Sequence, residues 1–79
     1  MNASQLHRIY TIHRFFACKK RASISVLSHR LNVSRSTLFR DLEVLKDIGA
    51  PLDYCAFSRK HYYHTHFQMP FEEFFKKVA

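Results

Sequence analysis

A short run of hydroxyl and guanidinium side chains lies near the middle of this 79-residue chain. It reads Ser34-Arg35-Ser36-Thr37, and Arg40 follows about one helical turn later. Arginine can pair with guanine through two hydrogen bonds, and serine or threonine can bond to bases or phosphates. Backbone N–H groups that open a helix behind a capping serine also receive a phosphate. These residue types in this order are typical of a segment that binds a polyanion.

The charge of the chain is unevenly distributed. The sequence has 13 Lys and Arg against 6 Asp and Glu, which gives a formal net charge of +7. Residues 1–40 hold eight cations and no acid, whereas residues 41–79 hold five cations and six acids. An ordinary solvated surface usually mixes both signs. The polarised charge therefore favours a nucleic acid as the partner over a membrane surface.

The composition limits the class of protein. With 47% apolar and 15% aromatic residues, the chain is too rich in apolar side chains for a disordered tail. No apolar run approaches the roughly 18–20 residues that span a bilayer, and no signal-peptide pattern is present. Cys18 and Cys55 are too few for a disulfide framework. We expect one small, cytoplasmic domain without a membrane contact and with reduced cysteines.

Apolar spacing and capping residues predict mostly helices and one hairpin. We expect a first helix that Ser4 caps and that runs to about Cys18, followed by helices at about 26–31 and 35–48. Two strands are expected next, at 52–57 and 61–67, and Pro70 opens a short last helix. Asn32 to Ser34 reads as a tight turn, and Gly49 with Pro51 ends the third helix. The helix 35–48 buries one face made of Leu38, Leu42, Leu45 and Ile48.

Two helices joined by a short turn form a helix-turn-helix. The major groove of DNA is about 12 Å wide and admits a helix, whose first side chains then reach the base edges. The hairpin that follows carries Arg59 and Lys60 at its tip. The order of elements therefore predicts a winged helix-turn-helix with a three-helix core and a two-stranded wing.

The sequence around the predicted recognition helix resembles a known family. The stretches concerned are Val33-Ser34-Arg35-Ser36-Thr37-Leu38-Phe39-Arg40-Asp41-Leu42, then Leu45, Gly49-Ala50-Pro51-Leu52 and Tyr62-Tyr63. They resemble the DNA-binding domain of DeoR-like bacterial regulators, including those with a WYL effector domain, from about Leu6 to His66. The resemblance implies a winged helix that binds duplex DNA and places Tyr62 and Tyr63 in a wing strand. The wing tip lacks the glycine that is common in this family.

We therefore predict a bacterial transcriptional regulator that binds double-stranded DNA at specific sequences. The expected contacts are Ser34, Arg35, Ser36, Thr37, Phe39 and Arg40 from the recognition helix, and Arg59, Lys60 and His61 from the wing. Phosphate is the expected target of Arg40, and Asp41 is expected to orient a basic neighbour through an ion pair. The alternative is a protein-interaction module that docks a partner through the hairpin and the aromatic C-terminal helix.

The C-terminal segment has its own pattern. We place the DNA-binding domain at residues 1–67 and an amphipathic helix at 68–79. Aromatic and aliphatic side chains recur there at helical spacing, namely Phe71, Phe74, Phe75 and Val78. They either cover the core of the same chain or form the interface of a homodimer.

Histidines and acids supply no further chemistry in the sequence. His64 and His66 share one face of the predicted strand, near His61 and Cys55, but no second pair of ligands completes a zinc site. Wing histidines would instead gain charge as the pH falls towards about 6 and add affinity for phosphate. No phosphate loop, catalytic triad or carboxylate pair appears. We expect no metal, no cofactor and no enzymatic activity.

Overall fold

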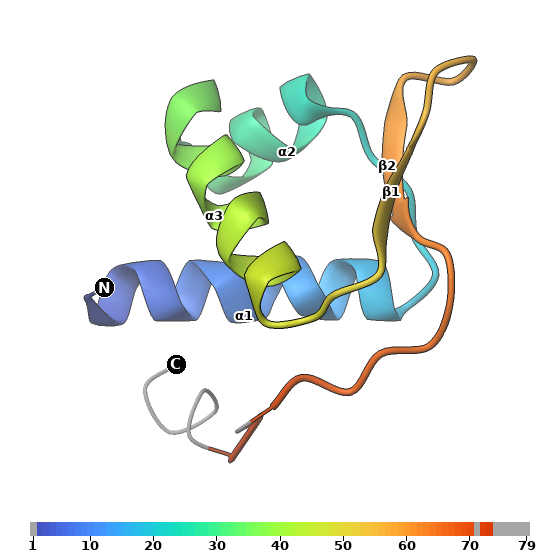
Figure 1. The fold of residues 1–79 in the computed structure, drawn as a ribbon. Helices are drawn as coiled ribbons and strands as arrows, with labels where there is room; N and C mark the ends of the chain where they lie inside the picture. Colours follow the sequence, from blue (N-terminus) through green and yellow to red (C-terminus); the bar gives the residue numbers. More distant parts are fainter. Residues whose placement is uncertain (1, 71, 74–79) are drawn as a thin grey trace.

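Three helices and one hairpin form the protein, whose computed structural model describes residues 2–70 and 72–73 (Figure 1). The helices are α1 (Ala3–Ala17), α2 (Ile24–Leu31) and α3 (Arg35–Asp47), and the strands are β1 (Leu52–Cys55) and β2 (Lys60–Tyr63). This arrangement confirms the mostly helical fold with a two-stranded wing. Of the segment predicted as a helix at 68–79, residues 68–70 are not helical, so the helix does not begin before Pro70. Phe71, Phe74, Phe75 and Val78 lie outside the described residues.

The helix boundaries follow from capping. Ser34 caps α3 by accepting a hydrogen bond from the Thr37 N–H at 3.1 Å, as predicted. Gly49 follows the helix with a φ of 103°, a conformation that glycine adopts without steric cost. Asn32 ends α2 in the left-handed region, with a φ of 55°.

Two predicted helix starts were wrong. Asn2, and not Ser4, caps α1, because its side chain accepts a 2.8 Å hydrogen bond from the Gln5 N–H. The second helix begins two residues earlier than expected, because Ser23 caps it. Val26 lies in the first turn of α2 and keeps 55% of its surface exposed.

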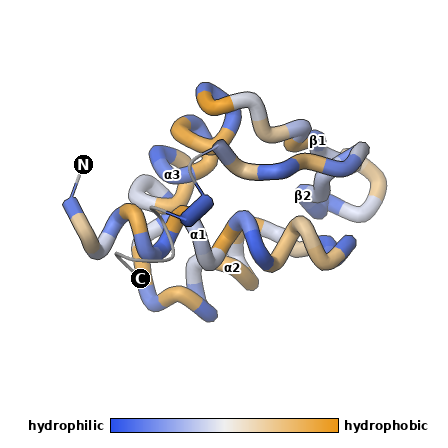
Figure 2. The backbone as a smooth tube through the Cα atoms, turned by 90° about the horizontal axis from the view of Figure 1, so that it is seen from below, coloured by the Kyte–Doolittle hydropathy of each residue, from blue (hydrophilic) through white to orange (hydrophobic). Residues whose placement is uncertain are grey.

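The core lies where α1, α2 and α3 meet. It is formed by fully or almost fully buried apolar side chains, chiefly Ile9, Ile12, Phe16, Leu27, Leu38, Leu42 and Leu45. Hydrophobic and hydrophilic stretches alternate along the helices, as expected of helices that bury one face (Figure 2). Leu38, Leu42 and Leu45 confirm the predicted inner face of α3, while Ile48 packs on the edge of the core.

The hairpin is shorter than the predicted one. β1 and β2 pair antiparallel from Leu52 opposite Tyr63 to Cys55 opposite Lys60. Residues 56–59 form the turn, and the chain bends away after Tyr63, so that His64 and His66 do not belong to a strand. Their expected position on one strand face was therefore wrong. In Figure 1 the start of α3 and the hairpin tip lie on the upper side of the molecule, and α1 lies on the lower side.

Among the described residues, no helix combines the length and the apolar character needed to cross a membrane.

Candidate nucleic-acid interface

The start of α3 presents polar and basic side chains to solvent. Arg35, Ser36, Phe39 and Arg40 are all exposed, and Phe39 keeps 50% of its surface accessible. Residues three or four positions apart share one face of a helix, so that Ser36, Phe39 and Arg40 form a single outward edge. This edge is opposite to the buried face of α3, and it is open to an approaching ligand.

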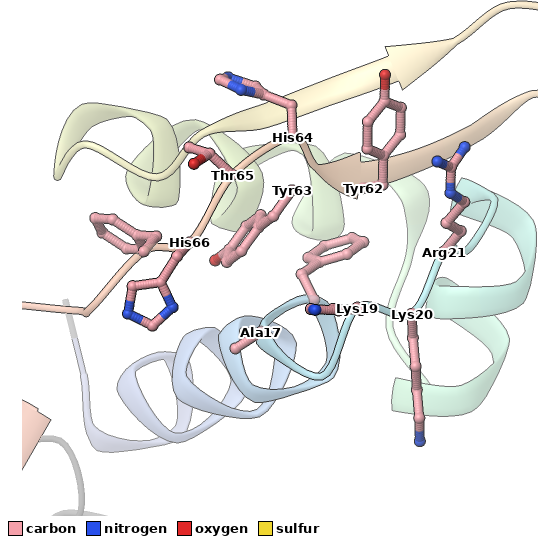
Figure 3. A pocket seen from close by; sticks show the side chains of 11 residues that line it. Ala17, Lys19, Lys20, Arg21, Tyr62, Tyr63, His64, Thr65 and His66 are labelled. Atoms are coloured by element: carbon pink, nitrogen blue, oxygen red, sulfur yellow. The ribbon is translucent and has the colours of Figure 1, made fainter.

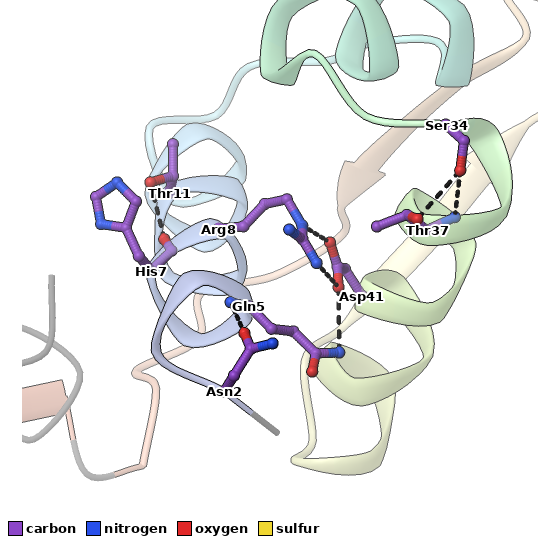
Figure 4. A network of polar contacts seen from close by, with 8 residues as sticks. All are labelled: Asn2, Gln5, His7, Arg8, Thr11, Ser34, Thr37 and Asp41. Carbon is purple, nitrogen blue, oxygen red and sulfur yellow. Dashed lines mark hydrogen bonds and ion pairs between the residues drawn. The ribbon is translucent and has the colours of Figure 1, made fainter.

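The hydroxyl groups at the helix start are occupied by the cap. Ser34 Oγ accepts the Thr37 N–H and also donates to Thr37 Oγ1 at 3.1 Å (Figure 4). Capping by serine contributes about 1 kcal/mol to helix stability. The hydroxyl groups of Ser34 and Thr37 therefore serve the cap, and the exposed Ser36 hydroxyl and the N–H groups of Arg35 and Ser36 remain for a ligand.

Arg35 reaches back to the preceding helix. Its guanidinium Nη2 donates a hydrogen bond to Ser25 Oγ, which lies in the first turn of α2. This contact holds the starts of α2 and α3 side by side at the surface. Because arginine has five N–H donors, the bond to Ser25 leaves others for a ligand. The sequence interpretation missed Ser25, which is visible only as a second exposed serine near the cap of α2.

Asp41 fixes how α3 is rotated about its axis. Its carboxylate is fully buried and forms an ion pair with Arg8 of α1, whose Nη2 donates at 3.1 Å (Figure 4). Gln5 Nε2 donates a longer bond of 3.4 Å to the same carboxylate. The pair raises the pKa of Arg8, mainly through the hydrogen bond to Asp41. The predicted ion pair of Asp41 is confirmed.

Arg8 was not expected to be the partner. Arg8 does not belong to the apolar face of α1, yet its side chain is only 19% exposed. A signal was present, because Asp41 lies between Leu38 and Leu42 on the inner face of α3. A buried carboxylate needs a partner, and only the crossing of α1 and α3 identifies it.

Two of the three predicted wing contacts, Arg59 and Lys60, lie at the tip of the wing. Arg59 is exposed and takes a φ of 59°, in a wing tip that lacks the glycine common in the family it resembles. Its N–H bonds to the Cys55 carbonyl at 2.7 Å, which closes the turn. Lys60 is exposed at the start of β2. Phe57 in the same turn is fully exposed.

His61 lies further from the tip and is half-buried. Its ring is 4.8 Å from that of Tyr54 across the hairpin, and its buried Nδ1 has no hydrogen-bond partner among the described residues. Burial, and then the charge of Lys46, lower the pKa of His61. This histidine therefore takes up a proton at a lower pH than an ordinary histidine.

The root of the wing is fastened to the helical core. Ala22 and His61 exchange two backbone hydrogen bonds of 3.2 and 2.8 Å, which attach the linker before α2 to β2. Tyr63 Oη lies 3.1 Å from Nδ1 of the buried His13 on α1, and its ring lies 5.3 Å from that of Phe16. The position of the hairpin relative to α3 is thus set by both backbone and side-chain contacts.

Metal-binding side chains do not gather within residues 2–70 and 72–73, where no group of three or more His, Cys, Asp or Glu could hold an ion.

A comparison with protein families identifies the domain. The family model described as "HTH domain" matches residues 8–54, which is more than half of the chain and includes all three helices except the start of α1. No curated protein and no solved structure matches the chain. The matched segment contains the buried Asp41, the exposed edge of α3 and all of the first wing strand except Cys55. The chain belongs to the HTH domain family, a family of helix-turn-helix DNA-binding domains.

Proposed function

We propose that the protein binds double-stranded DNA at specific sequences and regulates transcription in bacteria, in the manner of DeoR-like and WYL-type regulators. In this proposal α3 enters the major groove and the hairpin region 52–67 is the wing. One observation carries it. In a domain of the HTH family, the start of α3 and the tip of the wing lie on the same side of the molecule (Figure 1), and both carry exposed cations.

The exposed residues of α3 divide into two kinds of contact. Arg35 and Ser36, in the first turn, are placed to reach base edges, and Arg35 can pair with a guanine through two hydrogen bonds. Arg40, one turn further on, contacts a phosphate. The N–H groups of Arg35 and Ser36, directly after the cap, receive a second phosphate, and Phe39 contacts sugar and backbone.

The wing supplies contacts beside the groove. Arg59 and Lys60 are exposed at the tip and bind the flanking backbone. His61 contributes only at low pH, because burial lowers its pKa. The affinity of such phosphate contacts depends on salt, and log Kd changes by about 0.9 per log unit of salt for each phosphate neutralised.

The segment 68–79 completes the proposal, and its Met69 is buried in the core that residues 1–67 form. We propose that Phe71, Phe74, Phe75 and Val78 hold two chains together, which would present two recognition helices to a two-fold symmetric site. Sedimentation of the chain, compared with a variant in which Phe74 and Phe75 are changed to Ser, tests this proposal. A monomer at every concentration would contradict it.

The DNA-binding proposal is tested by selecting bound fragments from bacterial genomic DNA and measuring their affinity by fluorescence anisotropy. Arg35→Ala should weaken the selected site tenfold or more and relax its sequence preference, since one base contact contributes about 1–3 kcal/mol. Arg40→Ala should weaken all duplexes alike and lower the salt slope by about 1. The matched control is Arg14→Ala, which removes an exposed cation of α1.

Two results would contradict the proposal. If no duplex forms a salt-sensitive complex, the chain is instead a protein-interaction module. If Arg14→Ala reduces affinity as much as Arg35→Ala and Arg40→Ala do, the net charge binds the DNA and α3 does not read it.

A further inference from the structure

A cavity of about 470 Å³ lies at the root of the wing, away from the proposed DNA contacts. It is enclosed by the end of α1, by the linker between α1 and α2, and by the chain that leaves β2 (Figure 3). None of the residues proposed to contact DNA lines it. Its volume falls within the range of about 300–1,000 Å³ that is usual for sites of small molecules.

Three aromatic rings in mutual contact form one side of the cavity. Phe16 is buried and lies 5.3 Å from the ring of Tyr63, and Tyr63 lies 5.9 Å from the ring of Phe67. Tyr63 and Phe67 are half-buried, so that part of their surface faces the cavity. The His64 N–H bonds to the Pro51 carbonyl at 3.0 Å, which holds this wall in place. Such a surface suits a flat aromatic ring.

The linker that follows α1 adds cations to the lining of the cavity. Lys19 and Arg21 line the cavity and are exposed, and none of its described lining residues is acidic. The Arg21 guanidinium is 4.2 Å from the centre of the Tyr62 ring and lies beside it in Figure 3. Lys20 extends away from them, and its Nζ is 5.6 Å from the centre of the Phe15 ring. Lys19 and Arg21 are therefore the cations available to an anion in the cavity.

The backbone conformation at Lys19 does not favour a side chain. Lys19 follows the end of α1 with a φ of 61°, in the left-handed region that glycine adopts most easily. A lysine at this position is not required by the turn. Glycine would fit this backbone position better, so that Lys19 can be changed to Gly without strain.

We propose that this cavity binds a small organic phosphate that carries an aromatic ring, with the size of a nucleoside monophosphate. The phosphate pairs with Lys19 and Arg21, and the ring packs on Tyr63 and Phe67. His66, which also lines the cavity, is placed to donate a hydrogen bond to the ligand. This site is independent of DNA binding by α3, and it needs no residue of the proposed recognition surface.

Calorimetric titration of the full chain with adenosine 5′-monophosphate tests the proposal, with adenosine and inorganic phosphate as half-ligands at fixed ionic strength. The nucleotide should bind at least tenfold more tightly than either half, because only the nucleotide uses both the aromatic rings and the cations of the cavity. The double variant Lys19→Gly with Arg21→Gln should lower its affinity tenfold or more. Lys19→Gly also relieves the left-handed backbone, so the variant should remain folded, which circular dichroism verifies.

Controls separate this site from the DNA surface. Two control variants should bind the nucleotide as tightly as the unchanged chain does. One is Arg14→Ala, which removes an exposed cation of α1 outside the cavity, and the other is the double variant Arg35→Ala with Arg40→Ala. The proposal would be overturned if the chain bound the nucleotide and inorganic phosphate equally well. It would also be overturned if the double variant Lys19→Gly with Arg21→Gln bound the nucleotide as tightly as the unchanged chain. A third result would overturn it: a short duplex that displaces the nucleotide from the Arg35→Ala and Arg40→Ala double variant. Lys19 and Arg21 would then bind the DNA backbone.

Discussion

The guanidinium of Arg8 on α1 holds the buried carboxylate of Asp41 on α3 through both oxygens, with Nε donating to one and Nη2 to the other. Asp41 is fully buried, while its neighbour Arg40 is exposed. The ion pair therefore turns the outer edge of α3 towards solvent by fixing its inner edge. It links a residue of the helical core to the direction in which the proposed recognition surface faces.

This relationship predicts an asymmetric response to mutation. Arg8→Met should destabilise the fold by about 3–5 kcal/mol, because it leaves the Asp41 carboxylate buried without its partner. The double variant Arg8→Met with Asp41→Leu should lose much less, since no charge then remains in the core. Urea unfolding of the single and double variants measures both values. A double variant as unstable as Arg8→Met would mean that the pair itself stabilises the helix crossing.

A second prediction concerns the wing tip. Arg59 has a φ of 59°, which costs a residue with a side chain roughly 1–2 kcal/mol compared with the right-handed region. Arg59→Gly should therefore leave the protein as stable or up to about 1 kcal/mol more stable, while DNA affinity falls. Thermal unfolding and anisotropy measure the two effects on the same sample.

The control for this prediction is Arg59→Lys, which keeps both the charge and the side chain. It should lower neither stability nor affinity by a large factor. If Arg59→Gly binds DNA as tightly as the unchanged chain, the wing tip does not contact the phosphate backbone.

A third prediction concerns pH. The pKa of His13 is lowered, first by its burial, and that of His61 is lowered for the same leading reason. The unfolded chain then binds protons more readily than the folded chain between the lowered values and about 6.5. The free energy of unfolding should therefore be highest above about pH 6.5 and should decrease progressively as the pH falls below that value. Urea midpoints at pH 7.5 and pH 5 measure this change.

Replacement of His13 identifies the source of the pH effect. His13→Gln should reduce the difference in free energy of unfolding between pH 7.5 and pH 5, although the variant is less stable at pH 7.5 because Tyr63 loses its 3.1 Å partner. The exposed His7→Gln is the control on the same helix. If His13→Gln leaves this difference unchanged, groups other than His13 cause the pH effect.

The parts of the fold that the sequence predicted well have strong local signals. Ser34 and Gly49 bound α3, and Asn32 forms the left-handed turn, because each of these residue types suits a particular backbone conformation. The start of α1 was harder to predict. Asn2 and Ser4 are both good caps, so their local sequence does not decide between them.

Features that depend on contacts between distant segments were not predicted. The strands were expected to extend to Phe57 and Phe67 because aromatic residues are common in strands. Phe57 instead lies exposed in the turn, and Phe67 packs its ring at 5.7 Å from that of His13 after the strand has ended. The pairing of Arg8 with Asp41 likewise depends on how α1 and α3 cross, which apolar spacing does not specify.

An NMR titration of the chain with a selected duplex tests most directly that α3 receives the DNA. The largest amide shifts should fall in residues 34–40 and 56–60, and they should disappear from residues 34–40 in the Arg35→Ala and Arg40→Ala double variant at the same DNA concentration. Shifts confined to α1 and the linker that follows it, with residues 34–40 unaffected, would contradict the assignment of α3 as the recognition helix.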